Sequence, residues 1–271
     1  MAQPMRDEVL YYYDVHPTRE DLMGETPPHA RLVHYLMEVL AWLLREQVCA
    51  IHENFNCYQT PDEHEYPLAP DIAVIRGIPE LDTPSYRVGV YGPPPQVVFE
   101  FASKETWIRD LKEKPGEYAQ MGVEEYYAYD PNRPPLPSSR RRERRLFGWQ
   151  RDQATGMLRE VALEPAGMWS PQLDSFLVPD GSYLRLYDRA GNRRLTQAEE
   201  AERRAKIAEQ QAREEARRAK IAEQQAREEA RRAKIAEQQA REEAQRAKIA
   251  EQQARILAEK LRSLGIDPQD L

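Results

Sequence analysis

The sequence contains little cysteine and no long apolar segment. Its 271 residues include two cysteines, Cys49 and Cys57, which do not form a CxxC pair. No secretory signal is recognisable, and the longest apolar segment, residues 36–44, is interrupted by Glu38, so no run is long enough to cross a membrane. These absences argue against a disulfide-rich secreted fold and against a membrane protein. We expect a cytoplasmic, reducing setting with both cysteines buried as thiols.

Positive charge is scarce in the first part of the chain. The whole chain has 39 Lys and Arg against 46 Asp and Glu. Residues 196–271 contain 17 basic and 16 acidic residues, which leaves 22 and 30 for residues 1–195. An acidic domain attracts nucleic acid weakly. Five arginines within residues 140–145 offset this locally and predict either a phosphate contact or a solvated loop.

Apolar periodicity predicts an α/β domain with a mixed central sheet over residues 1–195. Apolar residues at steps of three and four predict a helix from Pro28 to Arg45. Five short segments predict strands, at residues 48–51, 56–59, 72–75, 97–102 and 126–129. Residues 77–95 are expected to form a loop, residues 146–163 a hairpin, and the stretch from there to Tyr187 mainly loops.

The segment from Asp110 to Met121 has a helical pattern that contains Pro115. Proline is tolerated in the first turn of a helix but kinks or breaks a helix interior. Two arrangements are therefore open. The regular helix begins near Lys114, with Pro115 in its first turn, or a longer helix is kinked at the proline.

Residues 196–271 are expected to form a long charged helix. A fourteen-residue repeat occurs three times over residues 203–244, and residues 196–199 fit a capping box. Fourteen residues make two heptads, so the repeat keeps phase with a coiled-coil seam. That seam would consist mostly of alanine, which buries little area, so a single solvated helix and a dimeric coiled coil both remain open. Gly265 and Pro268 predict the end of the helix.

Two carboxylates next to apolar strands are the first candidates for chemistry. Asp71 follows Pro70 at the start of one strand, and Glu100 interrupts the apolar segment 97–102. A carboxylate in such a strand is costly to bury unless it is paired or binds a metal ion. Carboxylates on neighbouring strands can hold Mg²⁺, and a lysine such as Lys114 can orient water or stabilise charge. Each residue taken alone is more often a surface residue, so the prediction depends on the three together.

The histidines give a weaker signal. None of the five has the spacing with cysteine that a zinc site requires. His29 and His34 lie near the first predicted helix. We expect them at the surface or as helix caps, with proton transfer as the alternative.

The chain resembles the Uma-two family of restriction-endonuclease-like proteins, a branch of the PD-(D/E)XK nuclease superfamily. The order and spacing from Asp71 to Asp130 carry this resemblance, and the charged tail does not. The matching residues are Pro70-Asp71, Glu100-Phe101-Ala102-Ser103, Thr106, Asp110, Lys114, Tyr118, Gly122-Val123, Glu125-Tyr126 and Asp130-Pro131. The likeness continues through residues 183–188 and 264–268, and so covers nearly the whole chain.

The resemblance implies a restriction-endonuclease-like core in which Asp71 and Glu100 bind Mg²⁺, with Mn²⁺ as an alternative. The lysine of the superfamily's E-x-K motif would fall at Ala102 and is therefore absent. The resemblance points instead to Lys114 in the following helix.

Other residues extend this implied site. Lys104 and Lys112 are the alternatives to the lysine named above, and Ser103 is expected to support the site through a hydrogen bond. Glu38 on the first helix is either an additional carboxylate of the site or a solvated acid.

The expected function is that of a metal-dependent endonuclease that hydrolyses DNA phosphodiester bonds. Two alternatives remain. The acidic domain and the absent E-x-K lysine favour a catalytically weak nuclease-like scaffold that acts through its tail. The acidic surface also suits a metal-dependent hydrolase of small phosphoesters. DNA and a second copy of the chain, bound through the core or the tail, are the expected partners.

Overall fold

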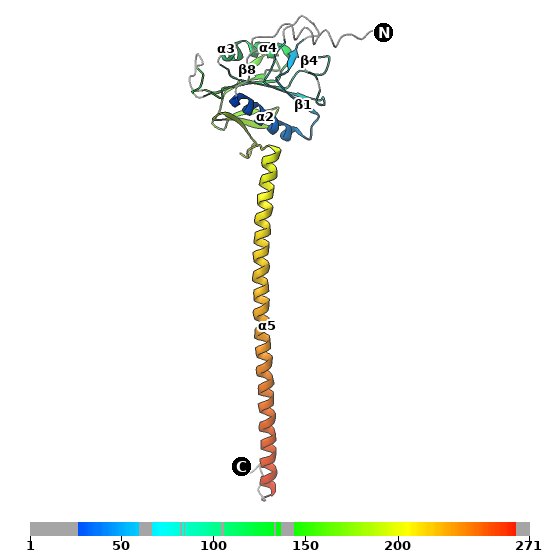
Figure 1. The fold of residues 1–271 in the computed structure, drawn as a ribbon, viewed down its shortest axis with the longest axis vertical. Coiled ribbons are helices and arrows are strands. Elements are labelled where there is room, and N and C mark those ends of the chain that lie inside the picture. The colour runs from blue at the N-terminus through cyan, green and yellow to red at the C-terminus, as the bar shows by residue number, and fades with distance from the viewer. Residues whose placement is uncertain are drawn as a thin grey trace, which may run out of the picture. The chain divides into compact units, whose positions relative to one another are not determined.

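The computed structural model describes residues 27–59, 67–81, 83, 85–103, 106–132, 134–136 and 144–263. The chain divides into two compact units, Met1–Ala201 and Glu202–Leu271, whose elements are drawn in Figure 1. Three predicted features lie outside the described residues: Lys104, the arginines at 140–142, and the helix end at Gly265 and Pro268.

A six-stranded sheet in the order β1-β3-β5-β6-β7-β8 forms the centre of the first unit. Strands β5 and β6 pair in parallel and the other neighbours pair antiparallel, so the predicted mixed sheet is confirmed. The predicted hairpin is also confirmed, as β7 and β8. The strands are β1 Cys49–Glu53, β3 Ile72–Arg76, β5 Val97–Phe101, β6 Glu125–Tyr129, β7 Leu146–Arg151 and β8 Leu158–Glu160.

The inner strands β3, β5 and β6 are buried on both faces, which explains why they are largely apolar. Side chains alternate along each strand, so Phe99 and Phe101 of β5 join a core cluster with helix α2 (Pro27–Leu44). Val98 faces the opposite way, into a second cluster with Trp107 and Tyr118. Glu100 therefore points to the second face, where helices α3 and α4 lie (Figure 1).

The helices largely follow the sequence predictions. Helix α2 matches the first predicted helix to within one residue at each end. The segment that contains Pro115 forms two short helices, α3 Trp107–Lys112 and α4 Lys114–Met121. Pro115 occupies the first turn of α4, so the first of the two arrangements is correct. Gly122 ends α4 with a left-handed φ of 98°, a conformation that glycine adopts without strain.

Two parts that the sequence predicts as loops contain strands. Strand β4 (Ser85–Arg87) pairs in parallel with β2 (Asn56–Tyr58). The stretch up to Tyr187 forms a three-stranded antiparallel sheet in the order β11-β10-β9. Its strands are β9 Met168–Ser170, β10 Ser175–Asp180 and β11 Tyr183–Tyr187. The loop prediction was wrong here because these strands are short and β10 contains Pro179, which weakens a strand pattern.

Glu125, at the start of β6, joins the central sheet to the segment around β9. Its buried carboxylate accepts hydrogen bonds from the hydroxyls of Ser170 and Tyr127 and from the backbone N–H of Gln172. Burial raises the pKa of Glu125, and these donors oppose that effect.

Glu125→Ala is expected to lower the free energy of unfolding by about 3 kcal/mol, because several buried donors lose their acceptor. Urea denaturation of the full chain measures this loss. Glu124→Ala is the control, since Glu124 is partly exposed and contacts Arg151 at 3.5 Å. A loss for Glu125→Ala no larger than that of the control would contradict the anchoring role.

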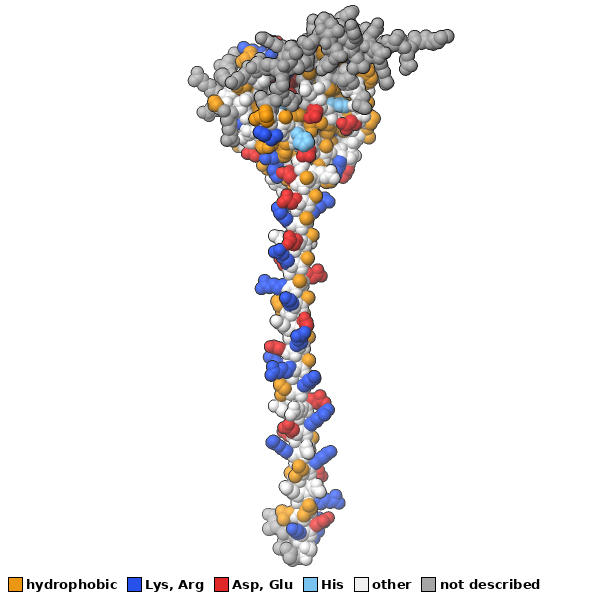
Figure 2. All heavy atoms as spheres, in the orientation of Figure 1, with side chains coloured by type: hydrophobic (Ala, Val, Ile, Leu, Met, Phe, Trp, Pro, Cys, Tyr) orange, Lys and Arg blue, Asp and Glu red, His pale blue; other side chains and the backbone are white. Residues whose placement is uncertain are grey.

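Helix α5 (Gln197–Ser263) is the long helix that the repeat predicts. Its capping box is confirmed: the Glu199 N–H donates to Thr196 Oγ1 at 3.1 Å and the Thr196 N–H donates to Glu199 Oε2 at 3.0 Å. Charges of both signs line the helix in Figure 2. Its ion pairs at i,i+4 are Glu202–Lys206, Glu209–Arg213, Glu223–Arg227 and Glu237–Arg241. At about 1.5 Å per residue the helix is about 100 Å long, and its pairing with a second copy stays a prediction.

Candidate active site

Asp71 and Glu100 lie side by side on neighbouring strands. In the antiparallel pairing of β3 with β5, Ile72 is opposite Phe99. One further step along this register places Asp71, directly before β3, opposite Glu100. The Phe101 N–H donates to Asp71 Oδ2 at 2.5 Å, which fixes the Asp71 carboxylate at the end of β5. The two acids are thus brought together, as the sequence predicts.

Lys114 joins Glu100 to a third carboxylate. As the first residue of α4, Lys114 places its Nζ 2.8 Å from Glu100 Oε1 and 3.0 Å from Asp110 Oδ1. The Tyr118 hydroxyl also donates to Glu100 Oε1, at 2.6 Å. The side chain of Lys114 is only 4% exposed, so this lysine belongs to a buried network.

Asp110 is held from the loop before α3. The Thr106 hydroxyl donates to Asp110 Oδ2 at 2.9 Å. Ser103 Oγ lies 3.0 Å from Thr106 Oγ1 and accepts the Thr106 N–H at 3.1 Å. Ser103 therefore supports the cluster indirectly, through Thr106 and Asp110.

The cluster contains more acidic than basic groups. Lys114 supplies one ammonium among the three carboxyl groups of Asp71, Glu100 and Asp110, and it contacts the last two of them. Burial raises the pKa of Glu100 to about 8; Lys114 opposes the rise, and the other two acids add to it. Burial also raises the pKa of Asp110. Glu100 and Asp110 raise the pKa of Lys114 despite its burial, so the lysine is charged. This site would therefore favour an added cation.

In EDTA the protein is expected to lose stability as the pH rises from about 5 to about 8. A carboxyl group whose pKa is raised by folding binds a proton in the folded state that the unfolded chain has released. Stability is therefore greatest at the acid end of this range and falls by up to about 1.4 kcal/mol per pH unit for Glu100. Urea denaturation at several pH values measures the slope. Glu100→Gln should flatten it, and an unchanged slope in that variant would contradict the assignment.

His29 also contacts the site, which the sequence analysis did not predict. Its Nε2 lies 3.1 Å from Asp71 Oδ1, and its ring packs edge-on against Phe101 with centroids 5.9 Å apart. The expectation of a surface or capping histidine was therefore wrong for His29, whereas His34 lies at the surface as expected. One signal was present: His29 lies three and four residues before Leu32 and Val33, on the same buried face of α2.

Comparison with known proteins identifies the family of the chain. The family model Uma2, described as "Putative restriction endonuclease", matches residues 11–174, a span that contains every residue of the cluster. The chain belongs to this family. The resemblance inferred from the sequence is thus confirmed, and the C-terminal part of the chain, including α5, lies beyond the matched span. No curated protein matches the chain.

A solved structure with likeness to the chain is a "putative nuclease belonging to DUF820" from Anabaena variabilis. It shares 15% sequence identity, covers 59% of this chain and 75% of its own, and has a TM-score of 0.38.

The chemistry of the donors in this family member fits a magnesium ion. Among the described residues, no group of three or more His, Cys, Asp or Glu is arranged to hold a metal. Mg²⁺ needs no such group, because it usually keeps several waters and takes one or two carboxylates together with substrate phosphates. Asp71 and Glu100 supply two carboxyl groups, and a divalent cation beside them would favour the ionised form of Glu100, whose pKa is raised by burial.

The remaining candidates lie elsewhere. Lys112 is exposed on α3. Arg144 pairs with Glu160 at 2.7 Å, and Arg145 donates to the carbonyls of Gly181 and Asn132. These two arginines of the basic block therefore have structural contacts in the folded domain.

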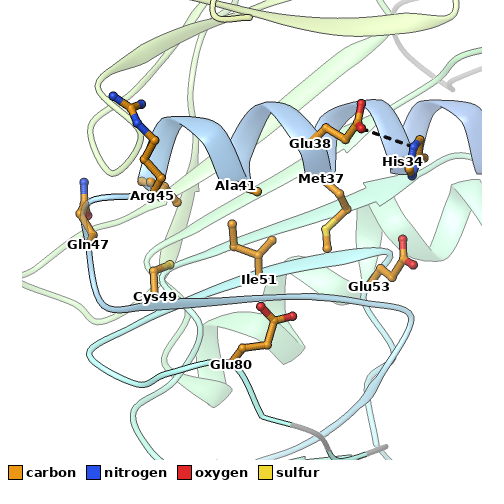
Figure 3. Close-up of a pocket in the computed structure, with 11 residues that line it drawn as sticks. His34, Met37, Glu38, Ala41, Arg45, Gln47, Cys49, Ile51, Glu53 and Glu80 are labelled. Carbon is orange, nitrogen blue, oxygen red and sulfur yellow. Dashed lines mark ion pairs between the residues drawn. The ribbon is translucent and has the colours of Figure 1, made fainter. Parts of the chain in front are cut away.

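Glu38 lines a separate pocket, of about 440 Å³, between α2 and β1 (Figure 3). Its carboxylate lies 3.7 Å from His34. Glu53 and Glu80 also face this pocket, whose lining includes no member of the Asp71–Glu100–Lys114 cluster.

Among the described residues, no helix is long and apolar enough to span a membrane.

Proposed function

We propose that the protein is a metal-dependent endonuclease that hydrolyses DNA phosphodiester bonds. The observation that carries the proposal is the pairing of Asp71 and Glu100 on neighbouring strands, with Lys114 bonded to Glu100. Membership of a family described as restriction endonucleases supports a nuclease. The metal dependence and the DNA substrate are our inference from the donors.

In the proposed reaction Asp71 and Glu100 would hold Mg²⁺, with Mn²⁺ as a substitute. When bound, the ion would lower the pKa of a coordinated water and offset charge on the phosphate. Lys114 opposes the rise in the pKa of Glu100 and holds its carboxyl group in place. An ammonium has three donor hydrogens, and the contacts to Glu100 and Asp110 use two of them. The third would orient the attacking water or a phosphate oxygen.

Two other functions have support from single features. The net charge of residues 1–195 is negative, with 22 basic and 30 acidic residues, which suits a small phosphoester better than duplex DNA. One isoleucine in each repeat of α5 is about half exposed, which suits a scaffold that binds through the helix. These isoleucines are Ile207, Ile221, Ile235 and Ile249.

The test is cleavage of supercoiled plasmid, of short duplex and single-stranded DNA, and of a small chromogenic phosphodiester, each with Mg²⁺, Mn²⁺ or EDTA. We expect metal-dependent cleavage of DNA by the wild type and none by Glu100→Gln purified in the same way. Turnover of the small diester alone would favour the small-substrate hydrolase. Lack of turnover on every substrate would favour the scaffold, and cleavage in EDTA would contradict the metal dependence.

A further inference from the structure

His29 is placed to control the geometry of Asp71. The two side chains are 17% and 18% exposed, and the atoms His29 Nε2 and Asp71 Oδ1 are 3.1 Å apart. A carboxylate can only accept hydrogen bonds, so the contact with ionised Asp71 requires a hydrogen on Nε2 of the histidine. The other oxygen of Asp71 accepts the Phe101 N–H. The carboxylate is therefore held at both oxygens, from two different elements.

The fold fixes His29 at this position. His29 begins the buried face of α2, which continues through Leu32, Val33 and Leu36 into the core. Its ring also packs edge-on against Phe101, whose backbone N–H holds the other oxygen of Asp71. The packing of α2 against the end of β5 thus sets both hydrogen bonds to Asp71.

We propose that His29 is a positioning residue, which orients the Asp71 carboxylate so that its remaining lone pairs face a divalent cation shared with Glu100. This inference rests on the proposed function, because it assumes that Asp71 is a metal ligand. Each carboxylate oxygen accepts more than one bond, so the contacts with His29 and Phe101 leave acceptor capacity on Asp71. Residues that orient metal ligands in this way usually change metal affinity about 10- to 100-fold when they are replaced.

The chain offers a conservative variant and a matched control. In His29→Gln the side-chain amide can donate from nearly the same place as Nε2, whereas His29→Ala removes the donor. His34 lies five residues further along α2, is 76% exposed and pairs with Glu38. His34→Ala therefore removes a histidine from the same helix without touching Asp71.

The experiment measures Mn²⁺ binding to the full-length protein by electron paramagnetic resonance of the free ion, with DNA cleavage as a second readout. We expect His29→Ala to bind Mn²⁺ about 10- to 100-fold more weakly, and its cleavage to recover partly at high Mn²⁺. His29→Gln should stay within a few-fold of the wild type, and His34→Ala should not differ from it. A purely structural histidine would lower the melting temperature without this pattern of rescue.

The results that would overturn the positioning role differ from those that would overturn the proposed function. If Asp71→Asn loses Mn²⁺ but folded His29→Ala binds it as the wild type does, the positioning role is wrong and the proposed function stands. Failure of His29→Gln to bind better than His29→Ala would also contradict the role. If the wild type binds no Mn²⁺, or Asp71→Asn binds it unchanged, the proposed function fails and this inference fails with it.

Discussion

Asp71→Asn and Glu100→Gln are each expected to lower the rate of metal-dependent cleavage by about 10³-fold or more, which corresponds to about 4 kcal/mol of transition-state stabilisation. Each substitution removes one of the two charged oxygen donors while keeping nearly the same shape. An amide cannot ionise, so each variant offers a divalent cation one anionic ligand fewer and binds it more weakly. Initial rates at saturating Mg²⁺, together with Mn²⁺ binding, measure the effect.

The fold should survive these substitutions. Burial disfavours the charged form of Glu100 and raises its pKa to about 8, so the neutral amide of Glu100→Gln suits the buried position. Asp71→Asn keeps one acceptor oxygen, enough for one of the bonds from Phe101 and His29. Glu38→Gln is the matched control, since its carboxylate lies in the separate pocket and its loss should leave cleavage unchanged. Cleavage at the wild-type rate by either site variant would remove Asp71 and Glu100 from the mechanism.

The sequence predicted those parts of the fold that carry a strong local signal. The apolar face of α2, the strands around Ala73 and Phe99, and the capping box at Thr196 all follow from residue spacing within a single element. Strands β9 to β11 could not be predicted in this way. Their pairings are local, such as Leu177 with Met168 and Asp180 with Tyr183, but Pro179 interrupts β10 and weakens its strand pattern.

The residues of the candidate site also divide into those that have a local sequence signal and those that have none. Asp71 and Glu100 could be found because an acid beside or within an apolar strand is conspicuous in the sequence. His29 could not be assigned, because its contact crosses 42 residues of sequence. The burial of Lys114 between Glu100 and Asp110 was equally hidden. It depends on how α4 packs on the sheet, which residue spacing does not report.

Lys114→Met is expected to lower the free energy of unfolding by about 3 to 5 kcal/mol, because it leaves Glu100 and Asp110 buried without their shared cation. The loss should be largest near pH 8. At lower pH the Glu100 carboxyl group already carries a proton, because burial raises its pKa to about 8, and it depends less on the ammonium. Cleavage should fall as well, even at temperatures where the variant is folded. Urea denaturation and initial rates, both on the full chain, measure the two effects.

A second substitution separates stability from catalysis. Asp110→Asn combined with Lys114→Met removes one of the two carboxyl groups that lose their cation, and should recover part of the lost stability. Activity should stay low, because no ammonium faces Glu100. Lys112→Met is the control, as an exposed lysine two residues earlier in the chain, and should be close to the wild type in both assays. If Lys112→Met or Lys104→Met abolished cleavage while Lys114→Met retained it, the catalytic lysine would have to be reassigned. Lys114 would then serve only to neutralise the buried acids.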